Sequence, residues 1–405
     1  MKDALVVSFS NNQWEGPKMN RHQIMKCISR QNMVLFVEPV LPIRESLAEL
    51  RATSHLKWLS KSLVIFQFPC WLGRIFAYPL IERYFQSMRK LILRRLIAKL
   101  RAGRQLIFYF WTPDYVPYLN IFDDCIKCYH IYDDFESYYN LNVDKTGLAE
   151  LRSNEIAMLM NADVAFGVTR ELCNKKSTTK RVHYIPNGVE YLHFNLEDKK
   201  QMAQPYELSA IAGPRFGYIG NITPKVDIEL LLEIFIKYPK WALIMVGQVH
   251  RAVAETDTFQ RLDRLSNIHF MGNQNYSDLP RWLKGIDVCL MPYRLDSHAF
   301  YGYPLKMLEY FSAGKPVVSS DIPAVREYST ILRIESGVDG WCKGMKESLN
   351  ENSDLKKDMR LKVAQDNTWQ KRVDNIFYCL SEEMNIDQLP KQNAESPQWT
   401  AISKS

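Results

Sequence analysis

Short apolar runs alternate with stretches of helical period through the first half of the chain. The apolar run at residues 4–10 is followed by a helical stretch at residues 20–31 and by a second apolar run at residues 33–39. These runs are apolar at successive positions, which is typical of strands that are covered on both faces of a parallel sheet. The alternation therefore predicts a doubly wound α/β domain. We expect its further strands at residues 63–68, 105–110, 126–133, 163–169 and 181–186.

The same alternation returns in the second half of the chain, after residues 196–213, where charged and small residues replace the apolar runs. We interpret that stretch as a linker between two domains. The second series predicts strands at residues 216–220, 241–247, 268–272, 287–293, 316–320 and 331–334. The predicted plan is two Rossmann-like domains, at residues 1–195 and 214–366. A last helix at residues 367–384 could pack on either domain and so cross back to the first, and residues 385–405 are polar enough for a tail.

Chain length and composition agree with this plan. The sequence has 405 residues, of which 46% are hydrophobic, and this is enough for two domains that each bury a core. The longest apolar runs are strand-sized, far below the roughly 20 residues that a membrane-crossing helix needs. The N-terminus shows no secretion signal, and the eight cysteines are scattered, several of them inside apolar runs, which favours a reducing compartment. We therefore expect a cytoplasmic protein.

The net charge of +7 comes from one segment. Residues 74–104 contain nine Lys or Arg and a single acid, Glu82, beside apolar residues at helical spacing. Such a helix can bind the anionic inner face of a membrane, and we expect it to do so through Arg89, Lys90, Arg94 and Arg95. The alternative is a helix that covers a sheet and carries a solvated basic back. No motif for nucleic-acid binding accompanies the cations.

The segment from Tyr301 to residue 320 contains the most informative pattern. Pro304 is placed to be the first residue of a helix, and Gly314 to end it. The free backbone N–H groups at that helix start would then form a site for a diphosphate, and Lys306 would add a full charge. Glu309 offers two acceptor oxygens to a diol such as that of ribose. The free amides are those of Leu305, Lys306 and Met307. The alternative is a surface helix with an ordinary Lys–Glu pair.

This segment closely resembles the donor-binding signature of GT-B glycosyltransferases of the family-four type, and of the related glucuronosyltransferase branch of polysaccharide biosynthesis. The resemblance implies two Rossmann-like domains facing a cleft. It implies transfer of a hexosyl group from a nucleotide diphosphate sugar, in particular a UDP-sugar, to a glycolipid or polysaccharide at the cytoplasmic membrane face. Glu309 matches the family's ribose-binding glutamate and Lys306 its phosphate-binding lysine. Tyr301 stands where the family has a glutamate that contacts the donor sugar.

Three further segments carry the same resemblance and are expected to bind donor. Residues 216–221 are similar to the family's first donor-domain strand and glycine loop, with Gly220 followed by Asn221 in place of an arginine and with Lys225 as the matching lysine. Met271 and Gly272 end a strand whose following loop meets the base in the family. Tyr293 ends the next strand. Each match could equally be a core strand and turn, so the order of the segments carries the argument.

Two groups in the first half are candidates for catalysis because they follow predicted strands, and ligands of open α/β sheets lie beyond the carboxyl ends of strands. His22 is expected to touch the donor sugar or its phosphate, or else to be a structural histidine. Asp133 and Asp134 are adjacent carboxylates that could take a proton from an acceptor hydroxyl if the reaction inverts configuration. The alternative for these acids is a capping or turn role.

No cofactor or metal ion is expected, because the helix start and Lys306 can offset the diphosphate charge. Two rival functions remain open at this point. A nucleotide-sugar epimerase of the same fold would consume donor without an acceptor, and a non-catalytic sugar-binding or scaffold protein would bind without turnover. A dehydrogenase is less favoured, because no Gly-x-Gly-x-x-Gly follows the first predicted strand.

Overall fold

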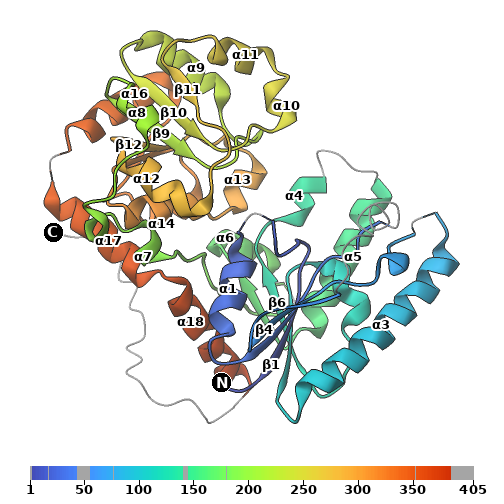
Figure 1. The fold of residues 1–405 in the computed structure, drawn as a ribbon. Helices are drawn as coiled ribbons and strands as arrows, with labels where there is room; N and C mark the ends of the chain where they lie inside the picture. The colour runs from blue at the N-terminus through green and yellow to red at the C-terminus, as the bar shows by residue number, and fades with distance from the viewer. Residues whose placement is uncertain are drawn as a thin grey trace. The chain divides into compact units, whose positions relative to one another are not determined.

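The computed structural model describes residues 2–16, 18–42, 55–75, 77–139, 145–178, 180–351 and 353–384 (Figure 1). The chain divides into two compact units. Among the described residues, unit 1 comprises those up to Pro186 and those from Arg372 to Met384, and unit 2 comprises Asn187–Lys371. The stretch that we expected to be a linker, at residues 196–213, lies within unit 2 and contains the short helices η3 (Glu197–Lys199) and α8 (Tyr206–Ser209).

Unit 1 is built on an eight-stranded sheet in the order β3-β4-β2-β1-β5-β6-β7-β8. All of its pairings are parallel except that of β3 with β4. The predicted apolar runs become buried strands, whereas β3, which was not predicted, lies at the sheet edge with all five residues exposed, Leu56, Trp58 and Leu59 among them. The strands are β1 (Leu5–Phe9), β2 (Met33–Val37), β3 (Leu56–Ser60), β4 (Leu63–Phe66), β5 (Leu106–Phe110), β6 (Ile126–Ile131), β7 (Val164–Gly167) and β8 (Val182–Tyr184).

Helices cover both faces of this sheet, as the doubly wound plan requires. Figure 1 shows α1 and the long α3 on opposite sides of the strands. The helices of the unit are α1 (Asn20–Ile28), η1 (Cys70–Leu72), α3 (Pro79–Arg101), η2 (Pro113–Tyr118), α4 (Phe135–Tyr139), α5 (Lys145–Asn161) and α6 (Arg170–Lys176).

Unit 2 contains a six-stranded sheet in the order β11-β10-β9-β12-β13-β14, and every pairing in it is parallel. The strands are β9 (Arg215–Ile219), β10 (Ala242–Val246), β11 (Ile268–Phe270), β12 (Val288–Met291), β13 (Val317–Ser319) and β14 (Arg333–Ile334). The chain builds outward from β9 in one direction and then returns to β12 on its other side. Because ligands of such sheets bind where the strand order reverses, the carboxyl ends of β9 and β12 mark the expected site.

The helices of unit 2 pack on this sheet with their apolar residues inward. In α9, for example, Leu231, Leu232, Ile234 and Phe235 are all buried in the core of the unit. The helices are α7 (Tyr191–Phe194), α9 (Ile228–Lys237), α10 (Arg251–Ala254), α11 (Asp257–Asp263), η4 (Tyr276–Asp278), α12 (Leu279–Lys284), α13 (Ser297–Tyr301), α14 (Leu305–Ser312), α15 (Pro323–Arg326), α16 (Gly337–Leu349) and α17 (Asp354–Asp366).

The last helix, α18 (Trp369–Glu383), begins in unit 2 and continues in unit 1 from Arg372. Within unit 1 the imidazole of His183 lies 2.8 Å from the carboxylate of Glu383, so the end of α18 is fastened to β8. The polar tail predicted at residues 385–405 lies outside the described residues. Across the described ranges, none of the helices combines the length and the apolar character that crossing a bilayer requires.

Candidate active site

The helix that carries Lys306 and Glu309 starts one residue later than predicted. α14 begins at Leu305, and Pro304 has an extended ψ of 114°, so this proline is the N-cap rather than the first helical residue. The N–H of Met307 donates to the Pro304 carbonyl at 3.3 Å, and only the amides of Leu305 and Lys306 lack an acceptor within the described part of the chain. Gly314 follows the helix with a φ of +70°, a conformation that favours glycine, which agrees with its predicted role as terminator.

The side chain of Lys306 lies between two phenols at the strand-order reversal. Its Nζ donates to the hydroxyl of Tyr218 on β9 at 2.9 Å and to that of Tyr293, just after β12, at 3.1 Å. The ammonium also faces both rings, 4.3 Å and 5.4 Å from their centroids. Burial alone would lower the pKa of Lys306, but the two tyrosines outweigh it and raise that pKa above its ordinary value. Lys306 therefore presents a permanent positive charge at the carboxyl ends of β9 and β12.

Two glycines make room for this lysine. Gly220 follows β9 with a φ of +140°, and a Cβ at this position would lie 3.0 Å from Nζ of Lys306. Gly247 follows β10 with a φ of +145°, and a Cβ there would lie 2.2 Å from the carbonyl oxygen of Gly220. Larger residues would both strain the backbone and close the space around the ammonium. The glycine loop that the sequence predicted thus lies against Lys306.

Glu309 lies on the same helix but forms no ion pair with Lys306 within the described ranges. The side chain is half-buried. Burial raises the pKa of Glu309 to about 7, the charge of Lys306 opposes this shift, and the nearby carboxylate of Glu190 adds to it. A carboxyl group that is partly protonated at neutral pH and has no cation bonded to it is available to bind a polar ligand.

The structure places Tyr276 and Glu190 near Glu309, and the sequence analysis did not single out either of them as a site residue. The phenol of Tyr276 hydrogen-bonds to the carboxylate of Glu190, and burial together with Glu309 and Glu190 raises the pKa of this tyrosine. His193 stacks on the Tyr276 ring with centroids 4.6 Å apart. Asn187 donates to the carbonyl of Tyr303 at 3.0 Å, which fastens this segment to the residues before α14. Glu190 follows Asn187-Gly188, a turn signal that gave no sign of where its side chain would lie.

The other predicted donor-binding residues lie along the same edge of the sheet, some close to Lys306 and others further from it. The carbonyl of Asn221 accepts from the Tyr218 hydroxyl, and the carbonyl of Lys225 accepts from the Arg294 N–H. Met271 and Gly272 follow β11, which β10 separates from β9. The structure thus brings Gly220, Asn221, Tyr293 and Lys306 together in one cluster, and places Met271 and Gly272 further along the edge.

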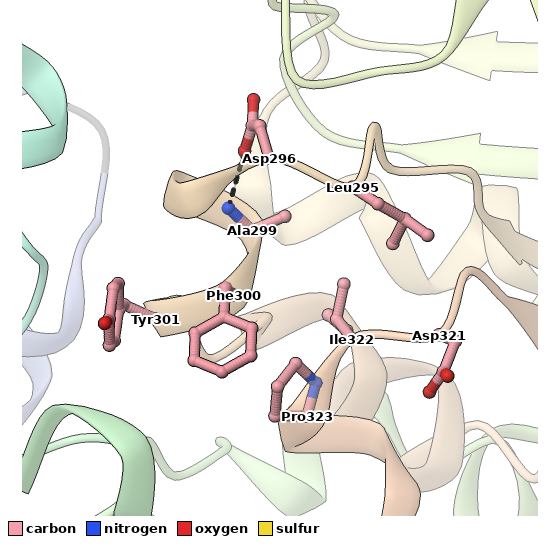
Figure 2. Close-up of a pocket in the computed structure, with 8 residues that line it drawn as sticks. All are labelled: Leu295, Asp296, Ala299, Phe300, Tyr301, Asp321, Ile322 and Pro323. Atoms are coloured by element: carbon pink, nitrogen blue, oxygen red, sulfur yellow. Dashed lines mark hydrogen bonds between the residues drawn. The ribbon is translucent and has the colours of Figure 1, made fainter. Parts of the chain in front are cut away.

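A cavity of about 320 Å³ opens beside α13, and Tyr301 is one of its lining residues (Figure 2). Leu295, Phe300, Ile322 and Pro323 form its apolar part. The carboxylate of Asp296 accepts from the Ala299 N–H at 2.8 Å, so it caps α13, and that of Asp321 pairs with Arg326. Neither Lys306 nor Glu309 lines this cavity. Tyr301, in the position where a sugar-binding glutamate was expected, therefore lies among mainly apolar neighbours.

In unit 1, His22 is a buried residue near the start of α1. Its Nδ1 accepts from the Met19 N–H at 3.0 Å, and its Nε2 lies 3.0 Å from the Gln13 carbonyl. The ring packs against Trp14 and Phe36. Burial lowers the pKa of His22 to about 4, so it is neutral at physiological pH. This geometry is that of a structural histidine, the alternative that the sequence left open, and contact with donor stays a prediction.

The two adjacent acids of unit 1 differ in surroundings. Asp134 is 1% exposed, and its carboxylate accepts from Lys175 at 2.9 Å and from Ser137. Burial alone would raise the pKa of Asp134, but these bonds and the charges of Lys175 and Lys176 hold it below its ordinary value. A carboxylate held in this way is a weak base. Asp133 is half-buried and accepts from the Asp134 N–H at 2.9 Å, and it remains the better candidate of the two.

The basic helix α3 is also less uniform than predicted. Arg89 is 2% exposed, pairs with Glu82 and donates to the Leu72 carbonyl at 2.7 Å, so it supports the core of unit 1 and does not reach the surface. This corrects the expectation that Arg89 contacts a membrane. Arg94 and Arg95 are exposed, and Lys90 is half-buried.

Comparison with known proteins agrees with this arrangement. Residues 213–350, which cover most of unit 2, match the family described as "Glycosyl transferases group 1". The chain is also 30% identical over 230 residues to TuaH of Bacillus subtilis (strain 168), a protein named as a teichuronic acid biosynthesis glycosyltransferase. That match covers 54% of this chain and 57% of TuaH, so the chain spans little more than half the length of this relative.

Solved structures resemble the chain over most of its length. Anabaena HepE in complex with UDP has a TM-score of 0.63 at 12% identity, over 94% of this chain and 100% of that protein. A UDP-forming α,α-trehalose-phosphate synthase from Burkholderia xenovorans has a TM-score of 0.65 at 11% identity, over 93% and 100%. Starch synthase IV from Arabidopsis thaliana, bound to ADP and acarbose, has a TM-score of 0.63 at 10% identity, over 95% and 100%.

The fold and the matched domain together define the class of protein. Two doubly wound α/β units, with structural neighbours of this kind, give the chain the GT-B fold. The family match places a glycosyltransferase domain in unit 2, the unit that contains Lys306 and Glu309. The predicted GT-B fold is therefore confirmed, and residues 213–350 match a glycosyltransferase family.

Proposed function

We propose that this chain transfers a hexosyl group from a nucleotide diphosphate sugar, a UDP-sugar in particular, to a glycolipid or polysaccharide acceptor. The observation that carries the proposal is the position of Lys306 and Glu309 at the carboxyl ends of β9 and β12. An ammonium without a carboxylate partner in the described chain suits a diphosphate, and the neighbouring carboxylate suits the diol of a ribose. Both groups face a ligand site that the reversal of strand order predicts.

The choice of UDP and of the acceptor rests on the relatives. HepE was solved with UDP, and TuaH is named for the biosynthesis of teichuronic acid. In our proposal unit 2 binds the UDP-sugar through Lys306, Glu309 and the loop after Gly220. Unit 1 binds the acceptor, with Asp133 as the base if the reaction inverts configuration.

A thermal-shift panel of nucleotides and nucleotide sugars tests the donor. A ligand that binds the folded protein raises its melting temperature, and at a concentration of 100 Kd the gain in stability is about 2.7 kcal/mol. We expect UDP and one UDP-sugar to raise the melting temperature, and Glu309→Ala to remove the effect. Glu255→Ala, which changes an exposed carboxylate at the residue after α10, is the matched control. No shift with any nucleotide would overturn the proposal.

Turnover separates the rival functions. A transferase releases UDP only when an acceptor is present, apart from slow hydrolysis. An epimerase would convert the UDP-sugar to its stereoisomer without an acceptor, and a scaffold would do neither. We also propose that no metal ion is required, because Lys306 and the start of α14 meet the diphosphate charge. Transfer that survives EDTA supports this point, and loss of transfer that Mg²⁺ restores contradicts it.

We further propose that α3 contacts an anionic membrane surface, where a lipid-linked acceptor would be held. The outward side of the helix is apolar as well as basic: Leu80 is 79% exposed, Tyr84 63% and Leu91 49%. These residues recur at positions that share one helix face, and Arg83, Arg94 and Arg95 flank them. A helix that only covers the sheet and exposes a basic side to solvent would not need exposed apolar residues on that side. The combination suits the boundary between acyl chains and headgroups.

Vesicle sedimentation tests this contact. Replacing Leu80 and Tyr84 with Ser is expected to lower binding to vesicles that contain anionic lipid, and replacing Arg94 and Arg95 with Gln is expected to lower it further at low salt. Leu355→Ser, at a 71% exposed position of α17, is the control because it removes an exposed leucine from unit 2. Equal sedimentation of all variants would remove the membrane from the proposal and leave the donor site unaffected.

A further inference from the structure

The two phenols that hold Lys306 do not have the same hydrogen bonds. The hydroxyl of Tyr218 accepts a hydrogen bond from Lys306 and donates one to the carbonyl of Asn221 at 3.1 Å, so its proton is already bonded within the protein. The hydroxyl of Tyr293 also accepts from Lys306, but its own proton has no acceptor within the residues that the structure describes. Tyr218 is therefore held in place by two hydrogen bonds, whereas the O–H of Tyr293 is available to donate to a ligand.

The ammonium of Lys306 also has one N–H that is available to donate to a ligand. A lysine carries three N–H donors, and the two phenols take two of them. Burial raises the pKa of Tyr293 to about 12, so this phenol keeps its proton at neutral pH and can donate it in a hydrogen bond. One N–H of Lys306 and the O–H of Tyr293 thus remain for a ligand, and their heavy atoms are 3.1 Å apart. Neighbouring oxygens of one phosphate or diphosphate can accept from both.

The surroundings restrict what this pair of donors can bind. Within the described chain, Lys306 forms no ion pair with a carboxylate, and it lies against the phenols of Tyr218 and Tyr293 and against Gly220. A cation whose hydrogen-bonding partners are phenols, with no carboxylate bonded to it, is suited to bind an anion. Asn221 brings no charge at the position where the family has an arginine. The loop after β9 therefore lacks that cation, and the two tyrosines assist Lys306 in its place.

We propose that Tyr218 and Tyr293 complete the diphosphate-binding part of the donor site in different ways. Tyr218 is a positioning residue that aims the ammonium of Lys306. Tyr293 is a binding residue that donates its O–H to a phosphoryl oxygen beside that ammonium. The inference rests on the proposed binding of a nucleoside diphosphate and adds to it the residues that distinguish the diphosphate from the bare nucleoside.

Calorimetric titration of the full chain with uridine, UMP and UDP tests the inference. Tyr293→Phe removes only the hydroxyl and is expected to weaken UDP about tenfold, which corresponds to about 1.4 kcal/mol, while the affinity for uridine stays unchanged. Tyr218→Phe is expected to weaken UDP by a smaller factor. Tyr328→Phe is the matched control, because the hydroxyl of Tyr328 bonds to another phenol, that of Tyr303, at 3.2 Å.

Combination with Lys306→Met separates the two roles. If Tyr218 acts through the lysine, Tyr218→Phe has no further effect on UDP binding once the ammonium is gone. If Tyr293 contacts the phosphate directly, Tyr293→Phe still weakens UDP in that background. A merely structural role for either tyrosine would lower the affinity for uridine and UDP alike and would lower the melting temperature of the ligand-free protein.

The outcomes distinguish the inference from the proposed function. A wild-type protein that binds UDP through Glu309 while Tyr293→Phe binds it equally well overturns the inference alone. A wild-type protein that binds no nucleotide overturns the proposed function. Equal weakening of uridine and UDP by Tyr293→Phe contradicts the phosphate contact, because the hydroxyl would then serve the nucleoside or the fold.

Discussion

Each unit has a lysine and a carboxylate near the carboxyl end of its sheet, but the two arrangements differ. In unit 1, after β6, Asp134 accepts directly from Lys175, and Lys176 lies 2.7 Å from the buried carboxylate of Glu155. In unit 2 the ammonium of Lys306 bonds only to phenols within the described chain, and Glu309 lies on the same helix without pairing with it.

The consequences appear in the pKa shifts. The lysines of unit 1 hold the pKa of Asp134 below its ordinary value, although burial opposes them. In unit 2 burial raises the pKa of Glu309 to about 7. Charges that satisfy one another stabilise a fold but leave nothing for a ligand, whereas charges kept apart at a sheet edge are available for binding. The comparison therefore favours a structural role for the network of unit 1 and supports the binding role that we propose for the pair of unit 2.

The largest expected effect comes from breaking the network of unit 1. Lys176→Met leaves the carboxylates of Glu155 and Asp134 in a buried place with one cation fewer, because Lys176 itself is only 6% exposed. The removal of one partner from a buried ion pair costs about 3–5 kcal/mol of unfolding free energy. Urea denaturation measures the loss. A change below about 1 kcal/mol would show that water already satisfies these carboxylates.

The second effect concerns ligand binding rather than stability. Lys306→Met removes a charge whose hydrogen-bonding partners are phenols, so it breaks no ion pair. We expect the affinity for UDP to fall about 100-fold, which corresponds to about 2.7 kcal/mol, while the affinity for uridine and the unfolding free energy change little. Titration calorimetry of this variant measures the affinities for UDP and uridine, and urea denaturation measures its unfolding free energy. A large loss of stability would place Lys306 with the structural lysines of unit 1.

The third effect is a pH dependence that arises from Glu309. Its folded pKa of about 7 lies above the ordinary value of 4.5, so the protonated acid predominates at pH 6 and the carboxylate at pH 8. The titratable groups near it in the described chain include Lys306 from its own helix, Glu190, and the phenols of Tyr276 and Tyr293. If the carboxylate binds ribose, the affinity for uridine rises about tenfold between pH 6 and pH 8. Uridine is the probe because it has no phosphate to titrate.

The same shift has the opposite sign for stability. Because the folded state holds this proton more tightly than the unfolded state, the contribution of Glu309 to stability is fully present below pH 4.5 and is lost as the pH rises through about 7. Glu309→Gln is expected to flatten both profiles. An unchanged uridine profile in that variant would assign the pH dependence to another group.

The smallest expected effect sharpens the contrast inside unit 1. Lys175 also bonds to Asp134, but its side chain is 30% exposed, so water can replace it. Lys175→Met is expected to cost about 1 kcal/mol, well below the cost of Lys176→Met. Parallel urea denaturation of the two variants measures the ratio. Equal losses would mean that burial of the lysine does not decide its contribution.

The sequence predicted the fold because its strands are apolar at successive positions. Thirteen strands follow the predicted apolar runs. β3 was not predicted: it is a short edge strand whose five residues are exposed although three of them, Leu56, Trp58 and Leu59, are apolar. The boundary between the units was placed too late: Asn187–Phe194 belongs to unit 2, because the Val189 N–H bonds to the Asn367 carbonyl and Asn187 bonds to Tyr303. These bonds join residues far apart in the sequence, and no local pattern reveals them.

What the sequence by itself determined about the site is the local part of α14: a helix ended by Gly314, with Lys306 and Glu309 one turn apart. Its start was predicted at Pro304, one residue before the observed start at Leu305. Only the tertiary structure decided the partners. The parallel pairing of β9 and β12 brings Tyr218 and Tyr293 to one ammonium, and packing of the segment after Asn187 brings Glu190 toward Glu309. Charge state follows from burial and from neighbours across the fold, which is why the same residue types became a closed network in unit 1 and an open site in unit 2.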